Sequence, residues 1–205
     1  MAQLLTKTRY FILAGIVMVW VWMVPKIVQP ALSKPPAPNI AIQYQYYSIS
    51  GSTASQLRQQ MNQRGPSGPD GRRFDGYTRW NVRWVYQYNS QPDRCKIASA
   101  NVNLTVNFMM PQWQAPPEVS PSLKTTWQRF VKALQTHENG HRDHGIGAAN
   151  VILKTLNTLP AKASCKLLET EANAKAMRII ADYSRKDVEY DRLTRHGATQ
   201  GVKFP

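Results

Sequence analysis

Residues 120–160 read SPSLKTTWQRFVKALQTHENGHRDHGIGAANVILKTLNTLP and decide how the second half of the chain folds. Ser120 and Pro121 are typical of a helix start, because serine caps free backbone amides and proline suits the first helical turn. Large apolar and histidine side chains then recur on one helical stripe, at positions 123, 127, 130, 134, 137, 141, 148, 152 and 156, before Pro160 ends it. We therefore predict one long amphipathic helix, with weak points at its glycines, positions 140, 145 and 147.

The residues around this helix predict the rest of an α+β domain. Apolar and polar residues alternate with strand periodicity in Ile40–Tyr46, Trp80–Tyr88 and Ala98–Met110, and a turn at Asn89–Asp93 joins the last two. A short helix is expected at about 52–62, a second long helix at about 163–183, and a loop at 189–201. We expect a three-stranded antiparallel sheet with two long helices packed on its apolar face.

Length and charge set limits on the function. The chain has 205 residues, enough for one domain of ordinary size but too short for two. Its 26 lysines and arginines against 12 acidic residues give a formal net charge of +14. This excess favours anionic partners or surfaces, and an anionic cell-envelope surface is one such partner.

The N-terminal residues 1–33 are typical of a signal peptide or a membrane anchor. Basic residues precede an apolar run from Tyr10 to Val24, which is shorter than the roughly 20 residues of a membrane span. Ala31 and Ser33 suit cleavage, whereas tryptophans at 20 and 22 with Lys26 suit an uncleaved helix held in the membrane through residues 10–28. Both readings export the remaining chain, so we expect a periplasmic or secreted protein, anchored to the inner membrane if the segment is uncleaved. Residues 34–39 then form a Pro-rich linker.

Export has two consequences for the rest of the chain. An oxidising compartment permits a disulfide between Cys95 and Cys165, the only two cysteines, and we predict that they are paired rather than free. Nucleic-acid binding fits the charge but neither the exported compartment nor any recognition motif, so no nucleic-acid partner is expected.

Residues 137–141, HENGH, form the motif H-E-x-x-H on the predicted helix. Histidines four residues apart project from one face, so His137 and His141 can bind one Zn²⁺ ion, and Glu138 can act as general base toward the metal-activated water. The alternative is a pair of polar residues on a solvated face with one core histidine. We favour the metal site, because two histidines and a glutamate on a buried stripe need partners.

The third zinc ligand is not decided by spacing alone. His144 lies one turn too far along the helix, and we expect it in the second shell of the site or facing the substrate. His196, in a loop after the second helix, is the preferred third ligand; the alternatives are Asp191, a glutamate at 169 or 171, and His144 itself. Asp191 is otherwise expected to orient a zinc-bound imidazole or to cap a turn.

The HENGH motif, the residues 190–201 (YDRLTRHGATQG) and the two cysteines resemble a bacterial family labelled as a domain of unknown function, number 922, over roughly residues 40–201. That family is described as predicted secreted zinc-dependent proteases. The resemblance implies a zincin-like catalytic domain over residues 40–205, and its Tyr-Asp-x-x-Thr-x-His-Gly segment suggests a role for His196.

These observations predict a zinc-dependent peptidase of the bacterial cell envelope, acting on a peptide or protein substrate. Tyr190 is expected to stabilise the oxyanion, or else to fill an interface as an ordinary packed aromatic residue. The alternative function is a non-catalytic envelope protein that binds zinc or a partner. In that protein a further ligand such as His144 would close the metal site.

Overall fold

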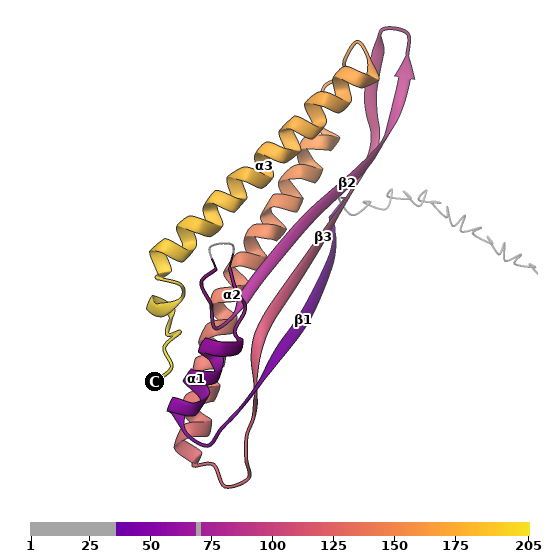
Figure 1. The fold of residues 1–205 in the computed structure, drawn as a ribbon. Coiled ribbons are helices and arrows are strands. Elements are labelled where there is room, and N and C mark those ends of the chain that lie inside the picture. The colour runs from indigo at the N-terminus through magenta and orange to yellow at the C-terminus, as the bar shows by residue number, and fades with distance from the viewer. Residues whose placement is uncertain (1–35, 69–70) are drawn as a thin grey trace, which may run out of the picture. The chain divides into compact units, whose positions relative to one another are not determined.

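The computed structural model describes residues 36–68 and 71–205 (Figure 1). The predicted signal or anchor segment, residues 1–33, lies outside the described residues. The described chain is an α+β domain, as predicted, with the order β1 (Asn39–Ser50), α1 (Ala54–Arg64), β2 (Tyr77–Gln91), β3 (Arg94–Gln114), α2 (Pro121–Asn157), α3 (Cys165–Thr194) and a 3₁₀ turn at Ala198–Gln200. Among these described helices, none combines the length and the hydropathy that crossing a membrane requires.

The sheet is mixed, so the prediction of a purely antiparallel sheet is wrong. Its strand order is β1-β3-β2, with β2 antiparallel to β3 and β1 parallel to β3. The hairpin between β2 and β3 forms at the predicted turn. The connection from β1 to β2 contains α1 instead of a tight turn, which lets the chain pass over the position of β3 and places β1 at the far edge.

The predicted long helix is continuous, because its glycines serve close contacts rather than breaks. A β-carbon at Gly140 would lie 2.4 Å from the ring of Tyr190, and one at Gly147 would lie 2.6 Å from the ring of Tyr183, both on α3. One at Gly145 would lie 2.8 Å from Trp80 of β2. The three glycines therefore let α3 and the sheet approach α2 closely.

α3 is longer than predicted and includes the first six residues of the segment expected to be a loop, 189–194. It ends at Thr194, where Arg195 adopts the left-handed conformation that commonly terminates helices. The following residues turn back onto α2, and Phe204 packs its ring against Trp127 and Phe130. At the opposite end of α3, Cys165 forms the predicted disulfide with Cys95 at the start of β3.

The core lies between the sheet and the two long helices, which run along the same face of the sheet (Figure 1). Alternate side chains of β3 form one side of the core, and buried side chains of α2 form the other side. The buried apolar residues of these two elements include Val102, Leu104, Val106, Phe108, Met110, Phe130, Leu134, Ala148, Ala149, Ile152 and Leu156.

Candidate metal site

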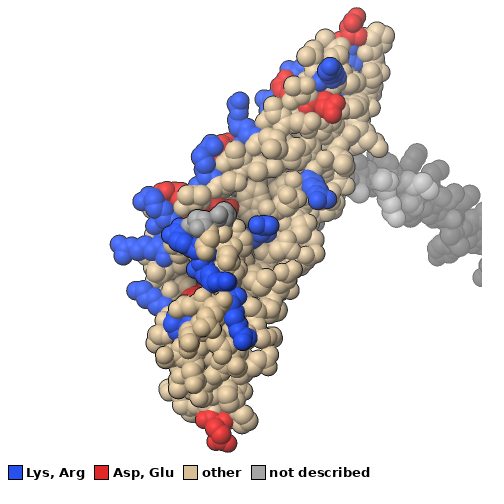
Figure 2. Space-filling view, viewed as in Figure 1, with Lys and Arg blue, Asp and Glu red and all other residues tan. Residues whose placement is uncertain are grey.

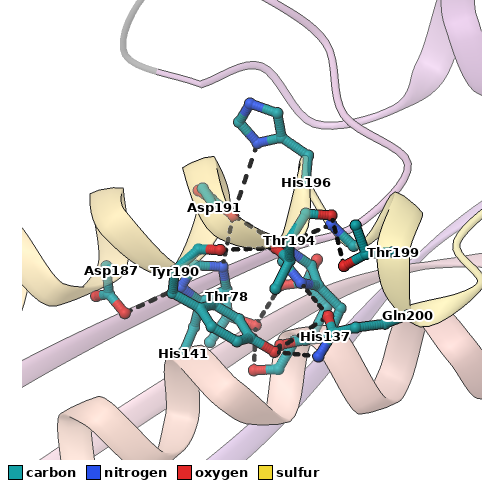
Figure 3. A network of polar contacts seen from close by, with 12 residues as sticks. Thr78, His137, His141, Asp187, Tyr190, Asp191, Thr194, His196, Thr199 and Gln200 are labelled. Carbon is teal, nitrogen blue, oxygen red and sulfur yellow. Dashed lines mark hydrogen bonds and ion pairs between the residues drawn. The ribbon is translucent and has the colours of Figure 1, made fainter.

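Two histidines of α2 and one aspartate of α3 converge between the two helices (Figure 3). His137 and His141 lie one helical turn apart and are 4% and 9% exposed. Each directs its Nε2 atom at the same atom, Oδ1 of Asp191, at a distance of 3.2 Å in both cases. The H-E-x-x-H spacing places the histidines, and the length of α3 brings the aspartate to them.

The outer ring nitrogen of each histidine is held by a separate residue. Nδ1 of His137 lies 2.9 Å from Oε1 of Gln200, in the 3₁₀ turn beyond α3, and Nδ1 of His141 lies 3.0 Å from Oδ1 of Asp187. Both partners are hydrogen-bond acceptors, so each imidazole donates from Nδ1. In the neutral form of each imidazole, Nε2 is then unprotonated and presents a lone pair to Asp191, whereas in the protonated form Nε2 donates to Asp191.

This arrangement fits a metal ion. When both imidazoles are neutral, two nitrogen lone pairs face a carboxylate oxygen, and these groups repel unless a proton or a metal ion lies between them. Three atoms at about 2.1 Å from one tetrahedral ion lie about 3.4 Å apart, and the two nitrogen–oxygen distances in this cluster are 3.2 Å. Hydrogen bonding from the outer nitrogen to an amide or carboxylate is also the usual support of a metal-bound histidine.

The pKa values of His141 and Asp191 also indicate that a positive charge stabilises the cluster. Burial lowers the pKa of His141, but the carboxylates of Asp187 and Asp191 outweigh it and raise the pKa to about 10. Burial raises the pKa of Asp191, but its contacts with His137 and His141 outweigh that and hold the pKa well below its usual range. A positive charge, proton or metal, therefore stabilises the cluster.

Asp187 connects the site to the sheet and to a third histidine. Its Oδ2 accepts a hydrogen bond from Nε1 of Trp80 at 2.6 Å, and its Oδ1 also lies 2.6 Å from Nδ1 of His144. His141, His144 and Asp187 form a second group with metal-binding geometry. This group shares His141 with the first, and His144 reaches it through Asp187, which contacts the ring nitrogens of both histidines.

Glu138 lies beside the histidines in a closed environment. Its side chain is 3% exposed, and its Oε2 accepts a hydrogen bond of 2.6 Å from the hydroxyl of Thr78 at the start of β2. Burial raises the pKa of Glu138, against the opposing effect of that hydrogen bond and of the two histidines. The loop before β2 closes over it, since a β-carbon at Gly76 would lie 3.0 Å from its Oε1.

Tyr190 occupies the space above Gly140. Its ring stacks on His137 with centroids 5.0 Å apart, and its hydroxyl donates to the backbone carbonyl of His137 at 3.2 Å. The amide of Gln200 donates to the same hydroxyl at 3.0 Å. The hydroxyl of Tyr190 is thus bonded to the backbone of α2 and to the 3₁₀ turn.

The structure places His196 outside the group of converging atoms. Its side chain is 45% exposed, and its Nδ1 lies 3.6 Å from Oδ1 of Asp191, on the side away from α2 (Figure 3). Asp191 is the carboxylate that meets the two histidines, because α3 continues about three turns past residue 183 and directs this side chain at α2. Among the described residues, the groups whose ligand atoms all lie within 4.8 Å contain neither His196, Glu169 nor Glu171.

Three supporting residues were not predicted from the sequence: Thr78, Asp187 and Gln200. Asp187 and Asp191 do show a local signal, since carboxylates four residues apart share a helix face. That signal has meaning only if the helix extends past residue 183. Neither Thr78 nor Gln200 has a recognisable pattern around it, because both reach the site through tertiary contacts.

Comparison with known proteins identifies the family. No curated protein and no solved structure matches the chain. One family model, described as a bacterial protein of unknown function (DUF922), matches residues 44–197, a range that contains the whole His137, His141 and Asp191 cluster. The match covers well over half of the 205 residues, and the chain therefore belongs to the DUF922 family.

Proposed function

We propose that this protein is a zinc-dependent peptidase of the bacterial cell envelope, with a zincin-like site. The observation that supports this most directly is that Nε2 of His137 and Nε2 of His141 each lie 3.2 Å from Oδ1 of Asp191, beside a buried glutamate. Three protein ligands and one open position are the usual arrangement of catalytic zinc. We propose zinc because two imidazoles and one carboxylate suit this ion.

The residues of the chain have separate tasks in this reaction. His137, His141 and Asp191 would hold the ion, and Gln200 and Asp187 would keep both imidazoles in the binding tautomer. A zinc ion supplies a Lewis acid that polarises the peptide carbonyl and makes a water molecule acidic. Glu138 would take the proton from the water at its carboxylate and pass it to the leaving amine. Thr78 would hold that carboxylate in place through its hydrogen bond.

The metal and the glutamate can be tested separately. The purified chain should contain about one zinc ion, hydrolyse unstructured peptides, and lose this activity on chelation. Glu138→Gln should retain zinc and lose hydrolysis, because Glu138 is not a ligand. His137→Ala should lose both. If Glu138→Gln loses zinc as completely as His137→Ala, the role proposed for Glu138 is wrong.

One observation favours a second candidate, a non-catalytic zinc-binding envelope protein. Glu138 is only 3% exposed and already bonded to Thr78, so its carboxylate is poorly accessible to a substrate. In that protein, zinc would be retained and required for folding, and no peptide would be cleaved by the zinc-loaded chain. Zinc-dependent hydrolysis that Glu138→Gln abolishes would exclude this candidate.

A further inference from the structure

The edge strand β1 lacks the features that usually protect a sheet edge. It is hydrogen-bonded to β3 on one side, and no described strand pairs with its other side. Its sequence, NIAIQYQYYSIS, has no charged residue and no proline, and its register with β3 is continuous along all twelve residues. Edge strands normally carry charges, prolines or bulges that prevent another strand from pairing with them.

One face of β1 is also apolar and uncovered. Ile40, Ile42, Tyr44 and Tyr46 pair with Leu104, Val106, Phe108 and Met110 of β3, and so they lie on the same sheet face as the core. Their β3 partners are at most 2% exposed, whereas these four residues are 43–55% exposed. We call these four side chains the β1 ribbon. They continue the core surface beyond the area that α2 and α3 cover.

We propose that the β1 ribbon is a homodimer interface, in which β1 pairs antiparallel with β1 of a second copy. Two three-stranded sheets would then join into one sheet of six strands. The β1 ribbon lies at one edge of the sheet, whereas Thr78, which contacts Glu138, lies on β2 at the other edge. The proposal therefore does not depend on the proposed peptidase activity.

The spacing of the ribbon is self-complementary. A two-fold axis perpendicular to the sheet keeps the core faces of both copies on one side, so even-numbered residues must pair with even-numbered residues. With this axis at Gln43, Ile40 lies opposite Tyr46 of the second copy, and Ile42 lies opposite Tyr44. All four side chains then form isoleucine–tyrosine pairs across the strands, and pairs of β-branched and aromatic residues stabilise antiparallel sheets.

Charge also favours a second copy at this strand. The chain carries a formal net charge of +14, so two copies repel wherever their basic surfaces approach. On the face shown in Figure 2, lysine and arginine side chains gather along α3 and near the loop before β2, and the rest of that face is largely uncharged. The twelve residues of β1 contain none, so two edges can pair there without placing like charges opposite each other.

Cross-linking tests the register directly in the full-length chain, purified in a mild detergent that retains its N-terminal segment. Gln43→Cys places one thiol at the two-fold axis, where it faces its own copy, while Cys95 and Cys165 remain paired with each other. Asn107→Cys is the matched control, because Asn107 lies beside Gln43 on the same sheet face but on the inner strand β3. Under mild oxidation, we expect a covalent dimer from Gln43→Cys and none from Asn107→Cys. No dimer from either variant, or equal amounts from both, would overturn the proposal.

A charge substitution tests whether the pairing holds the dimer together. Ile42→Lys places one ammonium group from each copy in the interface. The substitution should be tolerated in the single chain, because Ile42 is already 45% exposed there. We expect light scattering after size exclusion to show a dimer for the wild type and a monomer for Ile42→Lys, with unchanged circular dichroism. A monomeric wild type would overturn the proposal. An Ile42→Lys dimer would mean that a different surface associates. If Ile42→Lys does not fold, the Gln43→Cys result still decides the question, because that variant leaves the ribbon intact.

Discussion

Thr78 of β2 and Tyr44 of β1 flank the same core residue, Phe108 of β3, but their surroundings are opposite. Thr78 is polar, 9% exposed and bonded to Glu138, under the two long helices. Tyr44 is aromatic and 46% exposed, and its ring stacks on Phe108 with centroids 4.7 Å apart. Burial in this sheet therefore follows the position of α2 and α3 and not the hydropathy of each strand.

The two edges of the sheet depart in opposite ways from the usual rule that apolar side chains are buried and polar side chains are exposed. At the covered edge, polar and ionisable groups are buried, which is tolerated because each has a partner and the cluster can bind a cation. At the uncovered edge, apolar groups are exposed, which is typical of a surface that meets another chain. The covered edge is thus a candidate for chemistry, and the uncovered edge a candidate for association.

The largest expected effect concerns the third ligand at the covered edge. Asp191→Ala should lower zinc affinity by about 10³-fold or more, about 4 kcal/mol, because it removes the atom that faces both histidines. His196→Ala should keep zinc affinity within about a few-fold. Competition titration with a chromogenic chelator measures both. If His196→Ala loses zinc and Asp191→Ala does not, His196 is the third ligand, as the sequence alone predicted.

The second prediction concerns the metal-free protein as pH rises. The pKa of His141 is raised to about 10 in the folded state, so its protonated form stabilises the fold fully below about pH 6.5, and this contribution is lost as pH approaches 10. The raised pKa of Glu138 acts in the same direction. The lowered pKa of Asp191 contributes stability above about pH 4.

Urea unfolding of chelated protein should therefore show a loss of a few kcal/mol between pH 6 and pH 10. Zinc should flatten this profile, because the ion replaces the proton between the ligands. A metal-free protein with equal stability at pH 6 and pH 10 would show that the cluster needs no cation.

The third prediction concerns the support of His141. Asp187→Asn should lower zinc affinity by about 10–100-fold, because it weakens the acceptor that holds Nδ1 of His141. Asp182→Asn is the matched control, since Asp182 lies on the same helix but pairs with Arg185 at the surface. Equal zinc affinity in the two variants would mean that Asp187 contributes only to packing.

The smallest expected effect concerns unfolding stability and two paired side chains on neighbouring strands. Val106 is 0% exposed and Ile42, its neighbour on β1, is 45% exposed. Val106→Ala should cost about 2 kcal/mol of unfolding free energy, through lost burial and a cavity. Ile42→Ala should cost less than about 1 kcal/mol in dilute protein, where chains are monomeric. Chemical denaturation measures both, and equal costs would show that β1 is covered in the single chain.

Local patterns predicted the elements well where the pattern was long. The stripe along α2 predicted a single helix and placed His137, Glu138 and His141 on its buried side. The alternation in β2 and β3 predicted the hairpin, and the two cysteines predicted their disulfide. The glycines of α2 were predicted to be weak points, but the helix is continuous, and they instead allow close contact with Tyr183, Tyr190 and Trp80, which lie far away in the sequence.

The end of α3 shows why the third ligand was difficult to predict. The segment after residue 183 has many charged residues and few apolar ones, so it resembles a loop when read alone. Tertiary contacts make it helical: Tyr190 fills the space at Gly140, and Asp187 bonds both Trp80 and the histidines. The sequence placed His196, the preferred third ligand, in that expected loop. In the structure, Gln200 and Phe204 hold the tail against α2.

The sequence by itself determined the helices, the strands and the H-E-x-x-H pair, because periodicity and i, i+4 spacing are local properties of the chain. Only the tertiary structure decided the strand order, the aspartate that faces the histidines, and the exposure of β1. Each of these depends on which segment reaches which neighbour. That outcome is set by the packing of α2 and α3 over two strands of a three-stranded sheet, and no local pattern in the sequence records it.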